Sequence, residues 1–142
     1  MKETTGNLWD VPTEIRVITT NGFVKRNGEC VMGAGCAKEA NERFPGLALK
    51  LGRYIKQYGN RCFRLGDGLA SFPVKHHWKE QADLELIKKS CGELMAMADK
   101  FSWNDVLLPR PGCGNGRLTW EEVKPVISEL LDDRVTVIIF EA

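Results

Sequence analysis

The chain has 142 residues, of which 43% are hydrophobic and 27% are charged, and its formal net charge is +1. This composition excludes a disordered chain, and the near-neutral charge excludes a strongly cationic coat for nucleic acids. No apolar run approaches the ~20 residues that a membrane-spanning helix needs. The length suits a single domain over residues 1–142. Because the first residues contain no apolar stretch typical of a secretion signal, we expect a cytoplasmic protein that binds no membrane.

The chain contains five cysteines, and they form no C-x-x-C pair. An odd number without a secretion signal predicts free thiols in a reducing compartment. We expect at least three of them to be small buried hydrophobic residues.

Strand-like and helix-like stretches alternate along the first half of the chain. Residues 14–20 are rich in β-branched side chains, which is typical of a strand. Residues 36–44 and 46–58 have helical spacing and are separated by Pro45-Gly46. Two short strands are then predicted at 61–65 and 69–74, around a Gly-Asp-Gly turn.

The second half continues the alternation. Residues 80–100 form the longest predicted helix, and residues 105–108 are a short apolar strand. Thr119 and Glu122 have the spacing of a capping box, so a helix should begin there, and Pro125 should kink or delay it. Residues 134–140 give the strongest strand signal. This alternation predicts an α/β fold with helices on both faces of a sheet.

Two glycine-rich loops, residues 31–37 and 109–116, each follow a predicted strand and precede a predicted helix. Glycine lets backbone N–H groups approach a ligand, and a helix N-terminus offers unpaired donors and a partial positive charge. In open α/β sheets such loops lie beyond the carboxyl ends of the strands. We therefore expect the two loops to form one site for a phosphate or diphosphate.

Either loop alone is more typical of ordinary turns than of a phosphate site. Neither matches the G-x-x-x-x-G-K-[ST] pattern of P-loop nucleotidases, and G-x-G-x-x-G is absent. The phosphate hypothesis therefore depends on both loops together.

Residues 72–79, with the sequence FPVKHHWK, contain both histidines of the chain. No further ligands stand at a suitable spacing, so we expect no metal. Lys75 belongs either to a solvated basic loop or to the ligand site, where burial and neighbouring cations would lower its pKa. Trp78 either stacks on a base or covers the end of the sheet. Cys113 is more typical of a small packing residue than of a nucleophile.

These stretches, taken in order, resemble a macro domain, the ADP-ribose-binding "Appr-1-p processing" family. The similarity is carried by Gly6-Asn7-Leu8, by the strand end at Asn21, by residues 32–37, by the F-P-x-K-x-x-W segment and by residues 109–120. It extends over nearly the whole chain. It implies a three-layer α/β/α fold with a central mixed sheet, and it is greatest to the subgroup of DNA ADP-ribosylglycohydrolase antitoxins and terminal ADP-ribose protein glycohydrolases.

The resemblance also implies roles for individual residues. Asn7, where the family often has Asp, and Leu8 would contact the adenine end of ADP-ribose, and Asn21 would face the distal ribose. Lys75 aligns with a lysine that acts on the anomeric carbon. The two loops would surround the diphosphate and distal ribose through Met32, Gly33, Ala34, Gly35, Cys36, Ala37, Pro111, Gly112, Cys113, Gly114, Asn115 and Gly116.

One departure from the family pattern distinguishes protein adducts from nucleic-acid adducts as substrates. Relatives that act on modified proteins carry an Asp acid/base in the second loop, where this chain has Gly116. The DNA-directed relatives have a glycine-rich loop there and keep the lysine. The resemblance therefore favours a nucleic-acid adduct, although loss of the carboxylate is equally compatible with absent catalysis. The basic residues that either approach a polyanion or form a solvated face are Lys25, Arg26, Lys75, Lys79 and Arg110.

Three functions follow from this resemblance. The first is an ADP-ribosylglycohydrolase that releases ADP-ribose from protein or from nucleic acid such as DNA, with Lys75 acting at C1″. The second is an ADP-ribose-1″-phosphate phosphatase that uses the same pocket. The third is a module that binds ADP-ribose without catalysis. In each case ADP-ribose is ligand or product, no cofactor is expected, and we expect a monomer.

Overall fold

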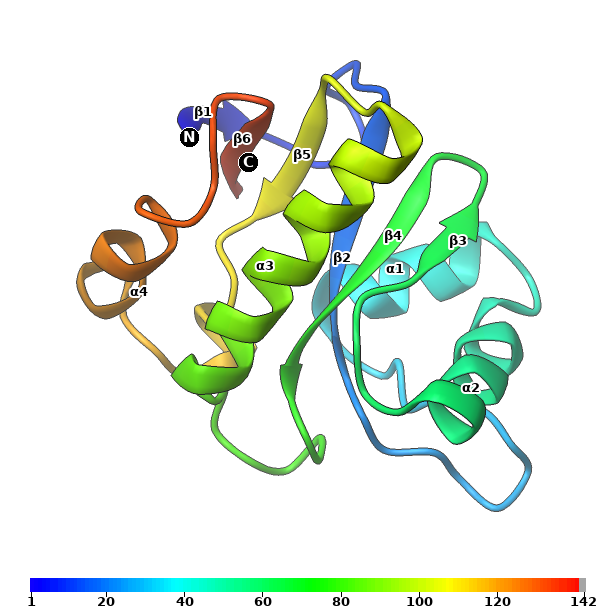
Figure 1. The fold of residues 1–142 in the computed structure, drawn as a ribbon. Helices are drawn as coiled ribbons and strands as arrows, with labels where there is room; N and C mark the ends of the chain where they lie inside the picture. The colour runs from blue at the N-terminus through cyan, green and yellow to red at the C-terminus, as the bar shows by residue number, and fades with distance from the viewer. Residues whose placement is uncertain (141–142) are drawn as a thin grey trace.

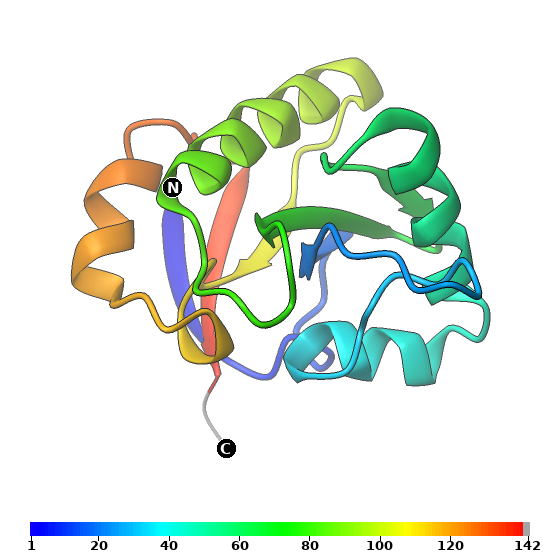
Figure 2. The same ribbon diagram turned by 90° about the horizontal axis from the view of Figure 1, so that it is seen from below.

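The computed structural model describes residues 1–140 and contains a six-stranded sheet between two layers of helices (Figure 1, Figure 2). The strand order is β1-β6-β5-β2-β4-β3. Every pair is parallel except β3–β4, so the sheet is mixed, as predicted. Glu141 and Ala142, the last residues of the predicted domain, lie outside the described residues. The strands are Lys2–Gly6 (β1), Ile15–Asn21 (β2), Arg64–Gly66 (β3), Leu69–Lys75 (β4), Val106–Pro109 (β5) and Val135–Phe140 (β6).

The helices cover the two faces of the sheet in pairs. Gly35–Arg43 (α1) and Leu47–Tyr58 (α2) lie on one face, and Leu84–Phe101 (α3) and Trp120–Ile127 (α4) lie on the other (Figure 2). The alternation of strand side chains supplies both cores: Val17 packs with α3 and α4, whereas Ile18 packs with α1 and α2. The predicted three-layer fold is confirmed.

β1 is a strand that the residue pattern alone does not predict. Its sequence, KETTG, contains no large apolar residue, and its side chains are exposed or half-buried. It forms the edge of the sheet and pairs in parallel with β6 from Lys2↔Thr136 to Gly6↔Phe140. Backbone ladder bonds therefore define this strand, and those bonds leave no hydrophobic pattern in the sequence.

Two helices begin directly after a residue whose side chain caps the helix N-terminus. α3 begins at Leu84, later than predicted, because the Asp83 carboxylate accepts the N–H groups of Glu85 and Leu86. α4 begins at Trp120, and the reciprocal capping box between Thr119 and Glu122 is formed. Pro125 lies inside α4 without delaying its start, and the helix ends only two residues later.

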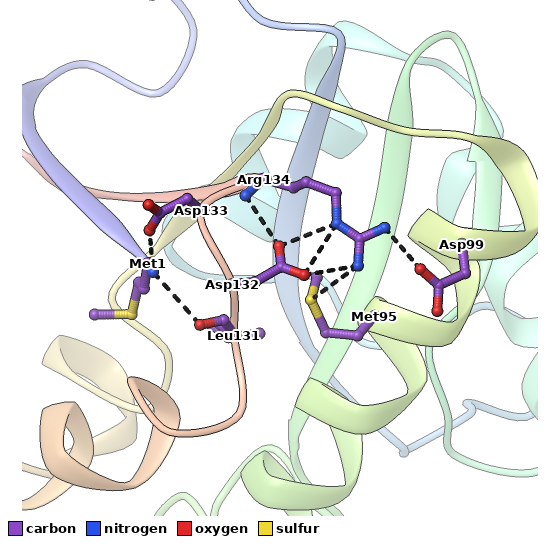
Figure 3. Close-up of polar contacts among 7 residues, drawn as sticks. All are labelled: Met1, Met95, Asp99, Leu131, Asp132, Asp133 and Arg134. Carbon is purple, nitrogen blue, oxygen red and sulfur yellow. Dashed lines mark hydrogen bonds and ion pairs between the residues drawn. The ribbon is translucent and has the colours of Figure 1, made fainter.

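A charged network surrounds Arg134, which directly precedes β6 (Figure 3). Arg134 donates from Nη1 to Asp99 on α3 at 2.7 Å and from Nη2 to Asp132 at 2.8 Å. The guanidinium therefore ties the start of β6 to α3. Within residues 1–140 no helix is long and apolar enough to cross a membrane.

Candidate functional site

A cavity of about 1270 Å³ opens at the carboxyl ends of the parallel strands. Its walls include the ends of β1, β2, β4, β5 and β6 and the segments that follow β1, β2, β4 and β5, which face the viewer in Figure 2. Ligand sites of small molecules usually occupy roughly 300–1,000 Å³, so this cavity is large enough for a dinucleotide-sized ligand. It lies where open α/β sheets generally bind ligands.

The first glycine loop leads into the N-terminus of α1 and leaves that end uncapped. The N-cap residue Ala34 supplies no side-chain hydrogen bond, and the first turn contains no acidic residue. The first backbone bond into the helix is Lys38 N–H to the Ala34 carbonyl at 3.3 Å. Among the described residues, the N–H groups of Gly35, Cys36 and Ala37 thus have no acceptor, and all three residues line the cavity. Such an end favours an anion.

The other α-helices do not share this property. α3 and α4 have side-chain caps from Asp83 and Thr119. In the first turn of α2, the Leu47 N–H donates to the Phe44 carbonyl and the Ala48 N–H donates to Asn41 Oδ1. Within residues 1–140, α1 is therefore the α-helix whose first three N–H groups all lack an acceptor, and it begins at the cavity.

The second loop forms a 3₁₀ turn, Gly114–Gly116 (η1), whose N-cap Cys113 also gives no side-chain bond. Gly112 and Gly114 have φ of 79° and 70°, a left-handed conformation that favours glycine. The carbonyl of Gly116 accepts the Ala82 N–H at 2.9 Å. This bond holds the loop against the segment that follows β4, so its backbone is fixed in position at the cavity wall.

Lys75, the last residue of β4, lies between these elements. Its Nζ donates to the Asn115 carbonyl at 3.0 Å and to the Trp78 carbonyl at 3.4 Å. Partial burial lowers the pKa of Lys75, and the nearby Arg117 guanidinium lowers it further. The amine is therefore easier to deprotonate than an ordinary lysine, which suits a group that acts on a bound substrate.

A register shift places Lys75 at the cavity. Thr20 pairs with Pro73, but the next residue of β2, Asn21, pairs with Lys75, so β4 contains an extra residue at this point. Pro73 has no N–H for the ladder, and its carbonyl accepts the buried Ser90 hydroxyl at 2.7 Å. A bulge redirects the side chains that follow it, and in the FPVK segment the residue that follows the bulge is Lys75.

Asn7 and Leu8, which directly follow β1, also line the cavity. Asn7 Oδ1 accepts the Trp9 N–H at 2.9 Å, so the amide nitrogen of Asn7 is directed away from this turn. Leu8 is buried, and within residues 1–140 its N–H has no acceptor. The two residues thus offer donors to a ligand, where a carboxylate at position 7 would offer an acceptor.

Asn21 lines the cavity, but its side chain already has partners in the protein. Its Nδ2 donates to the Val31 carbonyl and its Oδ1 accepts the Phe23 N–H, both at 2.9 Å. The amide therefore holds together the two ends of the segment between β2 and the first glycine loop. Its contact with a ribose stays a prediction.

The predicted site residues come together in this cavity with one exception. Pro111 is buried and is not among the residues that line the cavity, so its contact with a ligand stays a prediction. Which of the others contact a ligand stays a prediction. Several other residues line the cavity without having been predicted, of which the informative ones are Thr19, Ile138 and Phe140 on strands, Phe23 after β2, and Glu39 on α1.

The histidines and cysteines have structural partners. His76 Nε2 lies 3.1 Å from Asp83 Oδ2, and His77 Nδ1 accepts the Lys79 N–H at 3.1 Å. Among residues 1–140, no three His, Cys, Asp or Glu side chains are grouped so as to hold a metal ion.

All five cysteines are free thiols. Cys30, Cys62 and Cys91 are buried, as expected of small hydrophobic residues, and burial raises the pKa of Cys30 and of Cys91 to about 12. Burial also raises the pKa of Cys113, which argues against a nucleophilic thiolate there.

Comparisons with known proteins agree with this geometry. The chain is 31% identical over 114 residues to the ADP-ribose glycohydrolase OARD1 of Bos taurus, an alignment that covers 77% of the chain and 74% of the relative. The macrodomain of Mycobacterium tuberculosis DarG superposes with a TM-score of 0.81 at 26% identity, covering 99% and 97% of the two chains. The chain belongs to the macrodomain family. No protein-family model matches it.

A second group of relatives is longer than this macrodomain. The DNA ADP-ribosyl glycohydrolase of Thermus aquaticus is 30% identical over 141 residues, which cover 89% of the chain but 36% of the relative. The macrodomain thus spans about a third of the length of that curated relative. The isolated macrodomain of Thermus aquaticus DarG superposes with a TM-score of 0.80 at 28% identity, covering 99% of this chain and 97% of that one.

Proposed function

We propose that the protein binds ADP-ribose and hydrolyses the glycosidic bond at C1″ of an ADP-ribosylated macromolecule, with a nucleic-acid adduct as its substrate. The observation that carries this proposal is that two uncapped glycine loops and a lysine with a lowered pKa share one cavity. Family membership supports it, since relatives of the same family are named as ADP-ribose and DNA ADP-ribosyl glycohydrolases.

The loops supply the binding energy for the diphosphate. The open N–H groups at the start of α1 and the backbone of residues 112–116 line the same space. The two loops lie close together at Gly35 and Asn115. A Cβ built on Gly35 would lie 3.0 Å from Asn115 Nδ2. A hydrogen bond to a charged group contributes about 1.5–3 kcal/mol, so a few such donors are enough to hold a diphosphate.

Lys75 acts on the bound sugar in one of two ways. As a nucleophile, neutral Nζ forms a bond to C1″ while the bond from C1″ to the leaving group breaks and its electron pair goes to that group. Water then attacks C1″ and releases ADP-ribose and the amine. As a cation, Nζ instead stabilises the charge that develops on the departing group. Both roles need the amine next to the second loop, where it is held.

The scarcity of carboxylates among the described residues of the cavity wall supports a mechanism that uses Lys75. Of the described residues that line it, Glu39 is the one acid, and it belongs to α1 rather than to the second loop. Gly116 leaves its position in that loop without a carboxylate. Lys25, Lys79 and Arg110 also line the cavity, and cations there suit a polyanionic substrate.

The decisive experiment offers the protein three substrates under the same conditions. These are ADP-ribosylated DNA, a protein ADP-ribosylated on carboxylates, and ADP-ribose-1″-phosphate. We expect release of ADP-ribose from the DNA, measured by chromatography. Consumption of the phosphate alone would indicate a phosphatase. Binding of ADP-ribose in calorimetry without turnover of any substrate would indicate a binding module, and absence of binding would refute the proposal.

A further inference from the structure

Three aromatic rings line the cavity beside Lys75, and we call Phe23, His77 and Trp78 the aromatic rim. Phe23 meets the edge of His77 with ring centroids 4.6 Å apart, and His77 stacks on Trp78 at 5.6 Å with an interplanar angle of 26°. Phe23 and Trp78 are 36% and 45% exposed. The rings thus form one partly exposed aromatic surface at the cavity.

The aromatic rim is held firmly in place. The Lys75 carbonyl accepts both the Gly22 N–H at 3.1 Å and Asn60 Nδ2 at 3.0 Å, which joins the two segments that carry the rings. The Lys79 N–H donates to His77 Nδ1 and fixes the imidazole. A surface that is ordered before a ligand arrives loses little conformational entropy on binding.

Its position relative to the reacting atoms is set by Lys75. The Nζ atom that would act at C1″ also contacts the Trp78 carbonyl at 3.4 Å. The aromatic rim and the amine thus line the same part of the cavity, so a group attached to C1″ lies within reach of the rim. Flat rings at this point suit a flat leaving group, whereas an aliphatic carboxylate adduct has no face to stack on them.

Cations lie beside the rings. Lys79 Nζ is 5.1 Å from the centre of the Trp78 ring, and Arg117 Nη2 donates to the Lys79 carbonyl at 3.3 Å. Lys25 lines the same cavity. Aromatic rings interleaved with Lys and Arg are the combination that binds single-stranded nucleic acid, since bases stack and phosphates contact the cations.

We propose that the aromatic rim stacks on the nucleobase that carries ADP-ribose in a single-stranded nucleic acid, so that Trp78 and Phe23 determine substrate specificity. This inference rests on the proposed function and adds to it the residues that distinguish a nucleic-acid adduct from a protein adduct. Lys79 and Arg117 then contact the neighbouring phosphates.

The test compares kcat/KM for Trp78→Ala, Trp78→Phe and Phe23→Ala on two substrates. One is an oligonucleotide of about ten nucleotides with ADP-ribose on one base, a length within the range that single-strand sites cover. The other is an ADP-ribosylated protein. Tyr58→Ala is the matched control, because Tyr58 is an exposed aromatic residue on α2 that does not line the cavity. A comparison of DNA and RNA oligonucleotides of one sequence shows whether the modified base belongs to DNA or to RNA.

Loss of one stacked base predicts that Trp78→Ala lowers kcat/KM on the oligonucleotide roughly 5- to 150-fold. This loss should exceed any loss of affinity for free ADP-ribose by about fivefold or more. Trp78→Phe should recover most of the rate, and Tyr58→Ala should match the wild type.

Two results would overturn the proposal for the aromatic rim alone. One is an unchanged rate on the oligonucleotide in Trp78→Ala and Phe23→Ala, and the other is an equal loss on the nucleic-acid and protein adducts. A wild-type protein that does not bind ADP-ribose in calorimetry would overturn the proposed function together with this inference.

Discussion

Gly33 offers a direct test of the first loop as a phosphate site. It lines the cavity, and a Cβ added there would meet no heavy atom within 4 Å. Its backbone does not have a positive φ, so a larger residue introduces no strain. Gly114 lacks this advantage, because its φ of 70° would make any substitution affect folding as well as binding.

The expected effect of Gly33→Leu follows from the donors that the side chain would screen. The new side chain would occupy open space beside the unpaired N–H groups at the start of α1. Loss of one charge-assisted hydrogen bond costs about 1.5–3 kcal/mol, which weakens ADP-ribose binding roughly 10- to 150-fold. The free energy of unfolding should change by about 0.5 kcal/mol or less, because the site is open and unstrained.

Isothermal titration with ADP-ribose measures the affinity, and thermal unfolding measures stability. Gly92→Leu is the matched control: Gly92 is exposed on α3, also has open space for a Cβ, and does not line the cavity. We expect the control to bind like the wild type. A folded Gly33→Leu protein that binds ADP-ribose within about twofold of the wild type would show that the loop does not hold the diphosphate.

Three further predictions concern Lys75 and the segment that follows it. Lys75→Met removes Nζ but keeps the length of the side chain, so hydrolysis should fall to background while ADP-ribose affinity stays within about tenfold, or about 1.4 kcal/mol; full turnover would contradict the role of the amine. Partial burial and Arg117 lower the pKa of Lys75, so a nucleophilic amine predicts that kcat rises with pH through that lowered pKa, and that Arg117→Gln moves the rise to higher pH. A kcat that falls over the same range would indicate a cationic role instead. Asp83→Ala removes the cap of α3 and should lower the free energy of unfolding by about 1 kcal/mol at pH 7. Because hydrogen bonds from His76 and from the α3 backbone lower the pKa of Asp83 in the folded protein, this difference should shrink as the pH falls through that lowered pKa, and urea unfolding at several pH values should detect it. A difference that is independent of pH would contradict this explanation.

The sequence by itself predicted the features that depend on neighbouring residues. Helical spacing indicated the four helices, and runs of β-branched or apolar residues indicated strands such as β2 and β6, because both patterns reflect how neighbouring residues are buried. The capping box at Thr119 and Glu122 was predicted because the two groups contact each other within a single turn. The glycine loops could be placed at one edge of the sheet because parallel strands end on the same side.

The tertiary structure decided what depends on partners distant in the sequence. β1 is a strand because β6, more than 130 residues later, supplies its ladder. Pro111 is excluded from the cavity wall and Phe140 is included in it by the packing of loops and strand ends, for which single-residue patterns carry no signal.

The placement of Lys75 illustrates the same physical reason. Its residue type and its position at the end of a strand could be read from the sequence. That its Nζ meets the Asn115 carbonyl, 40 residues away, depends on the order of strands in the sheet and on the bulge at Pro73. Local spacing fixes which side of an element is buried, whereas only the assembled sheet determines which side chains share a cavity.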